Sequence, residues 1–188
     1  IEMYLKWKQN VIDVNDGDET CVDLMKVFVK LGDVYGRQGE YERSMEYLKK
    51  ALPMQVKEFG TEEHADVGET YGSMGWTCAS MGKFDEAMEY CTKSLKIRLA
   101  VLDEGHVDVG DSYHKIASVC DDQGKYDKAL EYYNKALTIK LNKLGEDHPD
   151  VAASYRNIGI LFENQKKYKE ALEHYTKALN IRTRTLGF

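Results

Sequence analysis

Proline is scarce in this sequence, with 2 among 188 residues, and glycine is limited to 15. This composition excludes a linker-rich or low-complexity chain. No apolar run approaches the roughly 18 residues that a membrane span needs, and the first residues lack the basic and apolar blocks of a signal peptide. We therefore expect a globular chain that is cytoplasmic and does not insert into membranes.

Cysteine and positive charge are also limited. The four cysteines form no CxxC pair and have no zinc-like spacing with histidine, so we expect free buried thiols, no metal site and no cofactor. The net charge of -6 argues against a nucleic-acid binder. This charge is uneven, because residues 1–24 carry a net -4 and residues 152–188 a net +4. The cysteines are Cys21, Cys78, Cys91 and Cys120.

One motif recurs with a spacing of 42 residues. It reads EEHADV at 62–67, EGHVDV at 104–109 and EDHPDV at 146–151. Equivalent atoms of stacked repeats lie roughly 10 Å apart, so the three histidines cannot share a metal whose ligands lie about 2 Å away. We expect these histidines to make local loop contacts. They are His64, His106 and His148.

The aspartates of the motif each precede a helical pattern. We predict that Asp66, Asp108 and Asp150 are the N-cap residues, because their side chains accept hydrogen bonds from free backbone N–H groups. Glu69 and Asp111 follow three residues later, where an acid suits a helix start.

Each period contains two helical patterns separated by a turn. In the first copy, Phe28, Leu31, Gly32 and Tyr35 follow the i, i+3, i+4, i+7 spacing of one helix face. Glycine marks the turn in three copies, where it can take a positive φ, whereas Lys166 in the fourth should cost about 1 kcal/mol. The turn glycines are Gly39, Gly82 and Gly124. Such a hairpin leaves apolar surface on both sides that only a stacked neighbour can bury.

These residues resemble the tetratricopeptide repeat. The family's small residues correspond to Gly32, Ser44 and Ala51 in the first copy, and to Gly159, Ala171 and Ala178 in the last. The stretch LGEDHPDVA at 144–152 is similar to the repeat of kinesin light chains. The resemblance implies an all-α fold, a right-handed α-α superhelix or solenoid of antiparallel helix hairpins, whose inner groove binds peptide segments of partner proteins.

The longer period has a simple explanation. The usual unit has about 34 residues and a proline near its end. Here that place lacks proline, so we expect the second helices to run on through Phe59, Leu102, Leu144 and Leu186.

We divide the chain into repeats at 25–67, 68–109, 110–151 and 152–188. Residues 1–24 fit the pattern poorly and are interpreted as part of a preceding repeat or a capping helix, with Trp7 packed on the first repeat; a frayed end is the alternative. The chain starts at Ile1 and stops at Phe188 directly after a helical pattern, so we expect a piece of a longer protein.

The resemblance also implies where a peptide would bind, namely the face of each first helix that alternates with its core stripe. The candidate peptide-binding residues are Lys26, Lys30, Asp33, Arg37, Glu69, Ser73, Trp76, His114, Lys115, Ser118, Arg156, Asn157 and Ile160.

Three features of this face stand out. Trp76, between the small residues Gly72 and Ser80, either receives an apolar anchor residue or packs against its own neighbours. Arg156 and Asn157 suit recognition of an acid and of a peptide backbone. In the first copy, Lys26, Lys30 and Arg37 form a basic strip that Asp33 could neutralise. Together with Asp121 and Asp122 in the third copy, this favours a mixed peptide with an apolar anchor near Trp76 and an acid near Arg156.

No group of residues outside the repeat pattern points to catalysis, so we do not expect an enzyme. The predicted function is a protein-interaction scaffold or adaptor with cargo recognition similar to that of kinesin light chains. The alternative is a self-association module, because an acidic start and a basic end suit head-to-tail stacking into a homo-oligomer.

Overall fold

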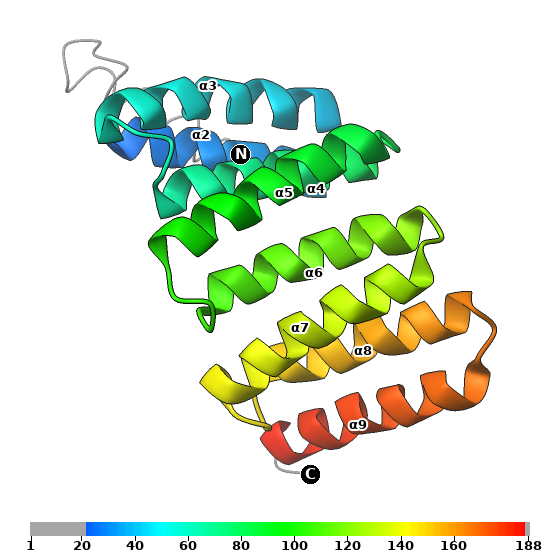
Figure 1. Ribbon diagram of the computed structural model, residues 1–188. Coiled ribbons are helices and arrows are strands. Elements are labelled where there is room, and N and C mark those ends of the chain that lie inside the picture. Colours follow the sequence, from blue (N-terminus) through cyan, green and yellow to red (C-terminus); the bar gives the residue numbers. More distant parts are fainter. Residues whose placement is uncertain (1–21, 187–188) are drawn as a thin grey trace. The chain divides into compact units, whose positions relative to one another are not determined.

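Eight α-helices and no strand make up residues 22–186, which are the residues that the computed structural model describes (Figure 1). The predicted all-α class is confirmed. The helices are α2 (Val22–Arg37), α3 (Tyr41–Phe59), α4 (Ala65–Ser80), α5 (Phe84–Val101), α6 (Val107–Asp122), α7 (Tyr126–Leu144), α8 (Pro149–Asn164) and α9 (Tyr168–Leu186).

The chain divides into two compact units, Ile1–Val101 and Leu102–Phe188. Each unit contains two helix hairpins: α2/α3 and α4/α5 in unit 1, and α6/α7 and α8/α9 in unit 2. Within unit 1, α3 also packs on α4, and within unit 2, α7 packs on α8. The hairpin-on-hairpin packing that the repeat predicted is therefore present in both units.

Small residues let the two helices of a hairpin approach closely. A Cβ built on Gly32 would lie 2.6 Å from Leu48 Cγ, and one built on Gly75 would lie 2.5 Å from Cys91 Sγ. In the last hairpin, a Cβ on Gly159 would lie 2.6 Å from the Tyr175 ring. Since real Cβ atoms do not approach other heavy atoms so closely, the first helix requires glycine at these places.

The predicted turns have the predicted backbone conformation. Gly39, Gly82 and Gly124 have φ values of 80°, 74° and 69°, and Lys166 in the fourth copy has a φ of 59°. Lys166 is the non-glycine residue with positive φ in the described part of the chain. The fourth turn therefore keeps the geometry of the others in spite of the steric cost that a lysine side chain brings.

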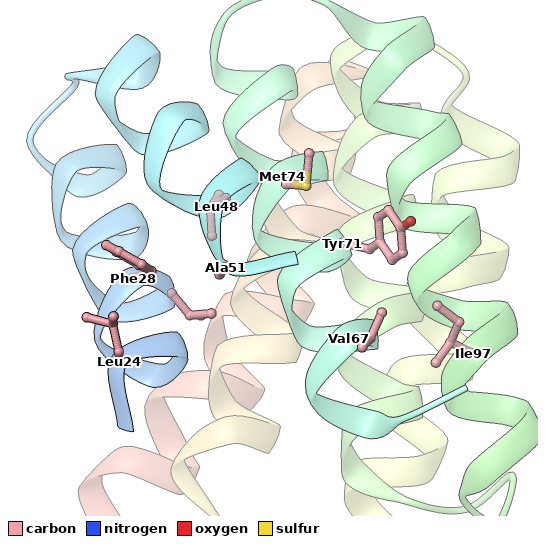
Figure 2. Packing of buried hydrophobic residues seen from close by; sticks show 9 residues of the cluster. Leu24, Phe28, Leu48, Ala51, Val67, Tyr71, Met74 and Ile97 are labelled. Atoms are coloured by element: carbon pink, nitrogen blue, oxygen red, sulfur yellow. The ribbon is translucent and has the colours of Figure 1, made fainter. Parts of the chain in front are cut away.

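Apolar side chains from consecutive helices interlock in unit 1 (Figure 2). Leu48 and Ala51 of α3 and Val67 of α4 have no exposed surface, and Met74 of α4 is 2% exposed. Full burial of one such aliphatic side chain contributes about 1.5–3 kcal/mol. This shared core buries apolar surface that a single hairpin would leave exposed.

The histidines of the repeated motif, and not the aspartates, are the N-cap residues. His64 Nδ1 accepts the N–H of Asp66 at 3.2 Å, and His106 and His148 do the same for the residues two positions on. The predicted aspartate caps are therefore wrong. Nδ1 is as many bonds from the backbone as an aspartate oxygen, so imidazole can reach the same N–H, while the aspartate lies in the first helical turn beside the positive end of the helix dipole.

The second helices are long, as expected, and end at Phe59, Val101, Leu144 and Leu186. The prediction that the second of them includes Leu102 is wrong by one residue, because a turn closed by the His106 N–H and the Asp103 carbonyl follows directly. Pro53 lies inside α3, where it removes one backbone hydrogen bond without ending the helix.

Part of the prediction for the start of the chain lies outside the described residues. This applies to residues 1–21, to the packing of Trp7 and to Cys21. The first described helix, α2, begins at Val22, three residues before the start assigned to the first repeat.

Candidate functional site

In unit 1, the predicted site residues of α2 and α4 form pairs across the two helices. Lys30 Nζ lies 3.6 Å from Glu69 Oε1, and the Ser73 hydroxyl donates to Asp33 Oδ1 at 2.8 Å. Glu69 of the next repeat, rather than Asp33, is thus the acid beside Lys30. Ser73 is only 8% exposed, so its contribution is to orient Asp33.

Trp76 lies at the surface of unit 1 with 40% of its area exposed. A Cβ built on Gly36 of α2 would lie 2.6 Å from Trp76 Cζ3, so one edge of the indole covers Gly36. Gly72 beside it is buried and Ser80 is exposed. The ring therefore combines the two arrangements that the sequence left open: α2 supports one edge, and the remaining surface is open to solvent.

The other unit 1 candidates are charged residues at the surface. Lys26, Lys30 and Arg37 are all exposed on α2. Between them, Val29 is buried in the core with 4% exposure. The basic strip thus lies along α2 at the edge of the apolar core that Val29 joins.

In unit 2, His114 of α6 contacts Asn157 of α8. His114 Nε2 lies 3.3 Å from Asn157 Nδ2, and the imidazole also packs beside the Tyr133 ring with centroids 5.2 Å apart. Burial and the nearby charge of Lys140 lower the pKa of His114 to about 4. The imidazole is therefore neutral at pH 7, and its Nε2 can accept the Asn157 N–H.

Lys140 of α7 is a buried cation with a carboxylate partner. Only 8% of the residue is exposed, and its Nζ lies 2.8 Å from Asp111 Oδ1 on α6. This ion pair links the N-terminal half of α6 to the C-terminal half of α7. Removing either Asp111 or Lys140 would leave the charge of the other side chain without its partner.

The opposite end of α6 is acidic. Asp121 accepts the Asn164 N–H groups at 3.2 and 3.3 Å, and burial raises the pKa of Asp121. Burial and the charge of Asp121 raise the pKa of Asp122. Ser118 is hydrogen-bonded to the Tyr133 hydroxyl, whose pKa is raised mainly by burial. These pairings occupy groups that were predicted to face a ligand.

Arg156 and Ile160 line a cavity of about 320 Å³ between α8 and α9. The remaining lining residues, which sequence reasoning missed, come from α9: Tyr175, Ala178, Leu179 and Arg182. The Tyr175 hydroxyl donates to Glu163 Oε2 at 2.5 Å. Burial and this hydrogen bond raise the pKa of Tyr175 to about 12, so its hydroxyl stays protonated at pH 7.

A signal for Arg182 was present in the sequence. Arg182 follows the small residue of its first helix at a fixed distance along the chain. At the same distance the other three copies also have a polar residue, although the neighbouring inward-facing residues of the second helix are apolar. These aligned residues are Gln55, Arg98 and Lys140. Gln55, Arg98 and Lys140 are buried, whereas Arg182 is exposed, so this polar position lies inward in three of the four copies.

The cysteines of the described residues are free and buried, as predicted. Cys78, Cys91 and Cys120 are exposed by 2% or less. Burial raises the pKa of the Cys78 and Cys120 thiols, which lowers their reactivity.

Residues 22–186 carry their acidic, histidine and cysteine side chains dispersed over separate helices. These residues contain no group of three or more His, Cys, Asp or Glu side chains that could hold a metal ion. No helix among them combines the length and the apolar character that crossing a membrane requires.

Helix hairpins repeated at a constant period, each with a small residue of one helix against a side chain of the other, define a helical-repeat protein. The family model described as "Tetratricopeptide repeat" matches residues 23–100, 80–142 and 108–184. These ranges cover most of the chain, which therefore belongs to the tetratricopeptide-repeat family. Repeats of this family generally serve as non-enzymatic protein-interaction scaffolds.

Solved structures share the fold at low sequence identity. BtubC (BKLC) from P. vanneervenii is 22% identical with a TM-score of 0.75, over 88% of this chain and 65% of that chain. A Podosopora anserina putative kinesin light chain with nearly identical TPR-like repeats is 19% identical with a TM-score of 0.69, over 98% of this chain and 93% of that chain. These similarities confirm the fold of stacked helix hairpins that the sequence indicated.

The fold also occurs in a protein with a phosphatase name. Aspartyl phosphate phosphatase F from Bacillus subtilis is 16% identical with a TM-score of 0.73, over 88% of this chain and 41% of that chain. A comparison with curated protein sequences gave no match.

Proposed function

We propose that this chain is a non-enzymatic interaction scaffold whose first helices bind a peptide segment of a partner protein, in cargo or adaptor recognition like that of kinesin light chains. The observation that carries the proposal is Trp76. A large aromatic side chain that is supported on one edge and 40% exposed loses little conformational freedom on binding and offers a large apolar contact area.

The surroundings of Trp76 suit a peptide that has both apolar and charged groups. Asp33 and Ser73 are hydrogen-bonded at 2.8 Å on the same pair of helices, and Lys30 and Glu69 form an exposed pair nearby along α2 and α4. An apolar ligand residue would cover the indole. Charged ligand residues would replace the contact between Lys30 and Glu69, and the loss of that contact costs little free energy because the pair is solvent-exposed.

In unit 2 the proposed contacts are those of Arg156, Asn157 and Ile160 on α8 and of Lys115 on α6. The Arg156 guanidinium is exposed and can bind a carboxylate in a bidentate manner. The Asn157 amide contacts His114, so its second N–H and its carbonyl stay available to a peptide backbone.

A random peptide library selected on the chain tests this proposal. Peptides that bind should lose about tenfold or more in affinity for Trp76→Ala, because truncation of an aromatic hot-spot residue costs about 2 kcal/mol or more. Leu99→Ala is the matched control, since Leu99 is a large apolar residue of unit 1 with 36% exposure. Selected peptides that bind Trp76→Ala as tightly as the unaltered chain would overturn the proposal.

Self-association is the second candidate function, and exposed apolar side chains of α9 favour it. Tyr168, Leu172 and Leu179 are 61%, 65% and 60% exposed. Light scattering at low and high salt separates the two candidates, because head-to-tail stacking of acidic and basic ends would weaken as salt rises. A chain that stays monomeric at all concentrations excludes self-association.

A further inference from the structure

Gly36 lies in the last turn of α2, where the backbone itself does not require glycine, since Gly36 is not among the glycines with positive φ. Glycines that a hairpin requires, such as Gly32, approach a large side chain of their own second helix. The nearest atom to a Cβ on Gly36 belongs instead to Trp76 of the next hairpin. Its own hairpin supplies only Ser44 Oγ at 3.3 Å, a contact that a shift of a few tenths of an ångström relieves. The contact with Trp76 is therefore what keeps a side chain out of this position.

The other copies have no glycine at the position aligned with Gly36. Ala79, Asp121 and Glu163 occupy it in the second, third and fourth copies. The position of Trp76 holds Ser118 in the third copy and Ile160 in the fourth. Glycine thus occurs in the copy that is followed by a tryptophan.

Two distances show which part of the indole faces Gly36. A Cβ on Gly36 would lie 2.6 Å from Trp76 Cζ3 and 3.5 Å from Cε3, the adjoining ring atom. A Cβ above the face of the ring would be nearly as close to Cε3 as to Cζ3. Gly36 therefore lies beyond the edge of the ring at Cζ3, and both faces of the indole are clear of it.

The polar group of the indole lies on the edge away from Gly36. Nε1 is attached to Cε2, which is the atom opposite Cζ3 in the six-membered ring. Within residues 22–186, the Trp76 N–H donates to no other residue, and 40% of the side chain is exposed. Because Nε1–H is a donor without acceptor capacity, it suits an oxygen atom that a ligand supplies.

The backbone around Trp76 is held in place from two sides. Thr77 is hydrogen-bonded to Ser44 of α3 at 3.0 Å, and both residues are buried. One turn earlier in α4, Ser73 donates to Asp33 of α2 at 2.8 Å. A side chain added at Gly36 would therefore displace the indole ring and not the helix that carries it.

We propose that Gly36 is a positioning residue, which holds the edge of the Trp76 indole against α2 and so directs Nε1–H toward a ligand. The ligand is a peptide segment with an apolar side chain over the indole and an oxygen acceptor, carbonyl or carboxylate, at Nε1. An apolar residue alone would cover the N–H and leave it unpaired, which lowers affinity. The inference rests on the peptide binding proposed for unit 1 and adds the hydrogen-bonding group that the ligand must carry.

The positioning is tested without a ligand. In a Trp7→Phe chain, Trp76 is the single tryptophan, so the fluorescence reports this indole alone. Gly36→Ala should shift the emission to longer wavelength and increase quenching by acrylamide, because the added Cβ displaces the ring into solvent. The urea midpoint should not fall, since alanine is more favourable than glycine in a helix.

Gly110→Ala is the matched control, because it makes the same change in the first helix α6, where the Cβ would meet Ile139 Cγ2 at 3.2 Å. It should leave the emission of Trp76 unchanged. Gly32→Ala, whose Cβ would meet Leu48 in the hairpin, shows the loss of midpoint that a packing glycine gives. Unchanged emission and quenching in Gly36→Ala, or a loss of midpoint equal to that of Gly32→Ala, would overturn the proposal.

The hydrogen bond is tested with library peptides that require Trp76. Benzothienylalanine, incorporated at position 76 of the Trp7→Phe chain, keeps the two-ring shape but has sulfur in place of the N–H. The peptides should bind this isostere about three- to tenfold more weakly, which is the effect of one hydrogen bond. They should also bind Gly36→Ala more weakly, and Gly110→Ala with unchanged affinity.

Alanine replacement of each acidic residue of the peptide separates the two sources of the acceptor. If one replacement makes binding insensitive to the isostere, the acceptor is that carboxylate. If every variant peptide keeps the sensitivity, the acceptor is a backbone carbonyl.

The two proposals fail separately in these experiments. If no library peptide depends on Trp76, the peptide binding fails, and the emission of Gly36→Ala still decides the positioning. If peptides depend on Trp76 but bind the isostere and Gly36→Ala as tightly as the unaltered chain, the peptide binding stands and this inference is overturned.

Discussion

Replacing Lys166 by glycine should stabilise the protein. Lys166 has a φ of 59° in the turn between α8 and α9, where the three other hairpins have glycine. At those glycines, an added Cβ would meet no atom within 4 Å. The turn is therefore open in space, and the difference between lysine and glycine lies in the backbone conformation alone.

The expected gain follows from two opposing effects. An L-residue in the left-handed region costs roughly 1–2 kcal/mol. Glycine avoids this cost, but it destabilises the folded state by about 0.5–1 kcal/mol because it has more conformational freedom to lose on folding. The net stabilisation of Lys166→Gly is therefore about 0.5–1 kcal/mol, and Gly124→Lys in the preceding turn should lose a similar amount.

Urea unfolding followed by far-ultraviolet circular dichroism measures this difference. With a denaturant dependence of about 2 kcal/mol per molar urea, the midpoint of the transition that includes unit 2 should rise by about 0.3–0.5 M. Lys167→Gly is the control, because Lys167 is not in the left-handed region and glycine there should give no gain. If Lys166→Gly and Lys167→Gly shift the midpoint equally, or Gly124→Lys is neutral, the conformational explanation is refuted.

Three other predictions concern unit 2, the packing of unit 1 and the thiols. Since the pKa of His114 falls from 6.5 to about 4 on folding, the unfolded chain binds a proton between these pH values that the folded chain does not, and stability drops as pH falls. His114→Gln should reduce the loss between pH 7 and 5 by up to about 2 kcal/mol in urea titrations, and an unchanged pH dependence would contradict this. Gly75→Ala should lower the free energy of unfolding by about 1–3 kcal/mol, because the added Cβ would lie 2.5 Å from Cys91 Sγ and 3.1 Å from the Cys91 backbone nitrogen. An unchanged thermal unfolding temperature would contradict this close contact. In a Cys21→Ser chain, the remaining thiols should react with a disulfide reagent only as fast as the protein opens, and immediate labelling without urea would show that they are accessible.

The arrangement of helices could be predicted from the sequence because it depends on local and periodic features. A glycine at three of the four turns and a small residue opposite a large one, such as Gly32 against Leu48, recur at a nearly constant spacing and need no knowledge of distant contacts. The one-residue error at Leu102 arose because no glycine marks that helix end, unlike Gly60 and Gly145 after the helices on either side.

The caps were assigned to the wrong residue for a chemical reason. Aspartate is a common N-cap and histidine is not, so Asp66 was preferred over His64. The choice depends on which residue has extended backbone, and His64 has φ -139° and ψ 143°. The identities of His64 and Asp66 alone do not determine which of the two residues has that conformation.

The candidate site was predicted only in part, since its residues belong to different helices. First-helix positions identified Arg156 and Ile160, but Arg182 lies on α9 and enters the same cavity only through the packing of the hairpin. Likewise, the partners of Asp33 and Lys30 lie one repeat further along the chain. Such pairings depend on the relative rotation of two helices, which hydrophobic spacing does not fix.

The polar pairs between neighbouring hairpins limit how freely the hairpins could be exchanged. In unit 1, Ser44 is hydrogen-bonded to Thr77 and Asp33 to Ser73, whereas in unit 2 the corresponding joint uses His114 with Asn157. A rearranged chain with the same hairpins in another order would place unlike donors and acceptors face to face and leave some of them buried without partners, which costs about 1–3 kcal/mol for each group. The polar contacts between neighbouring hairpins therefore depend on the order in which the copies follow one another. For this reason the copies are not interchangeable.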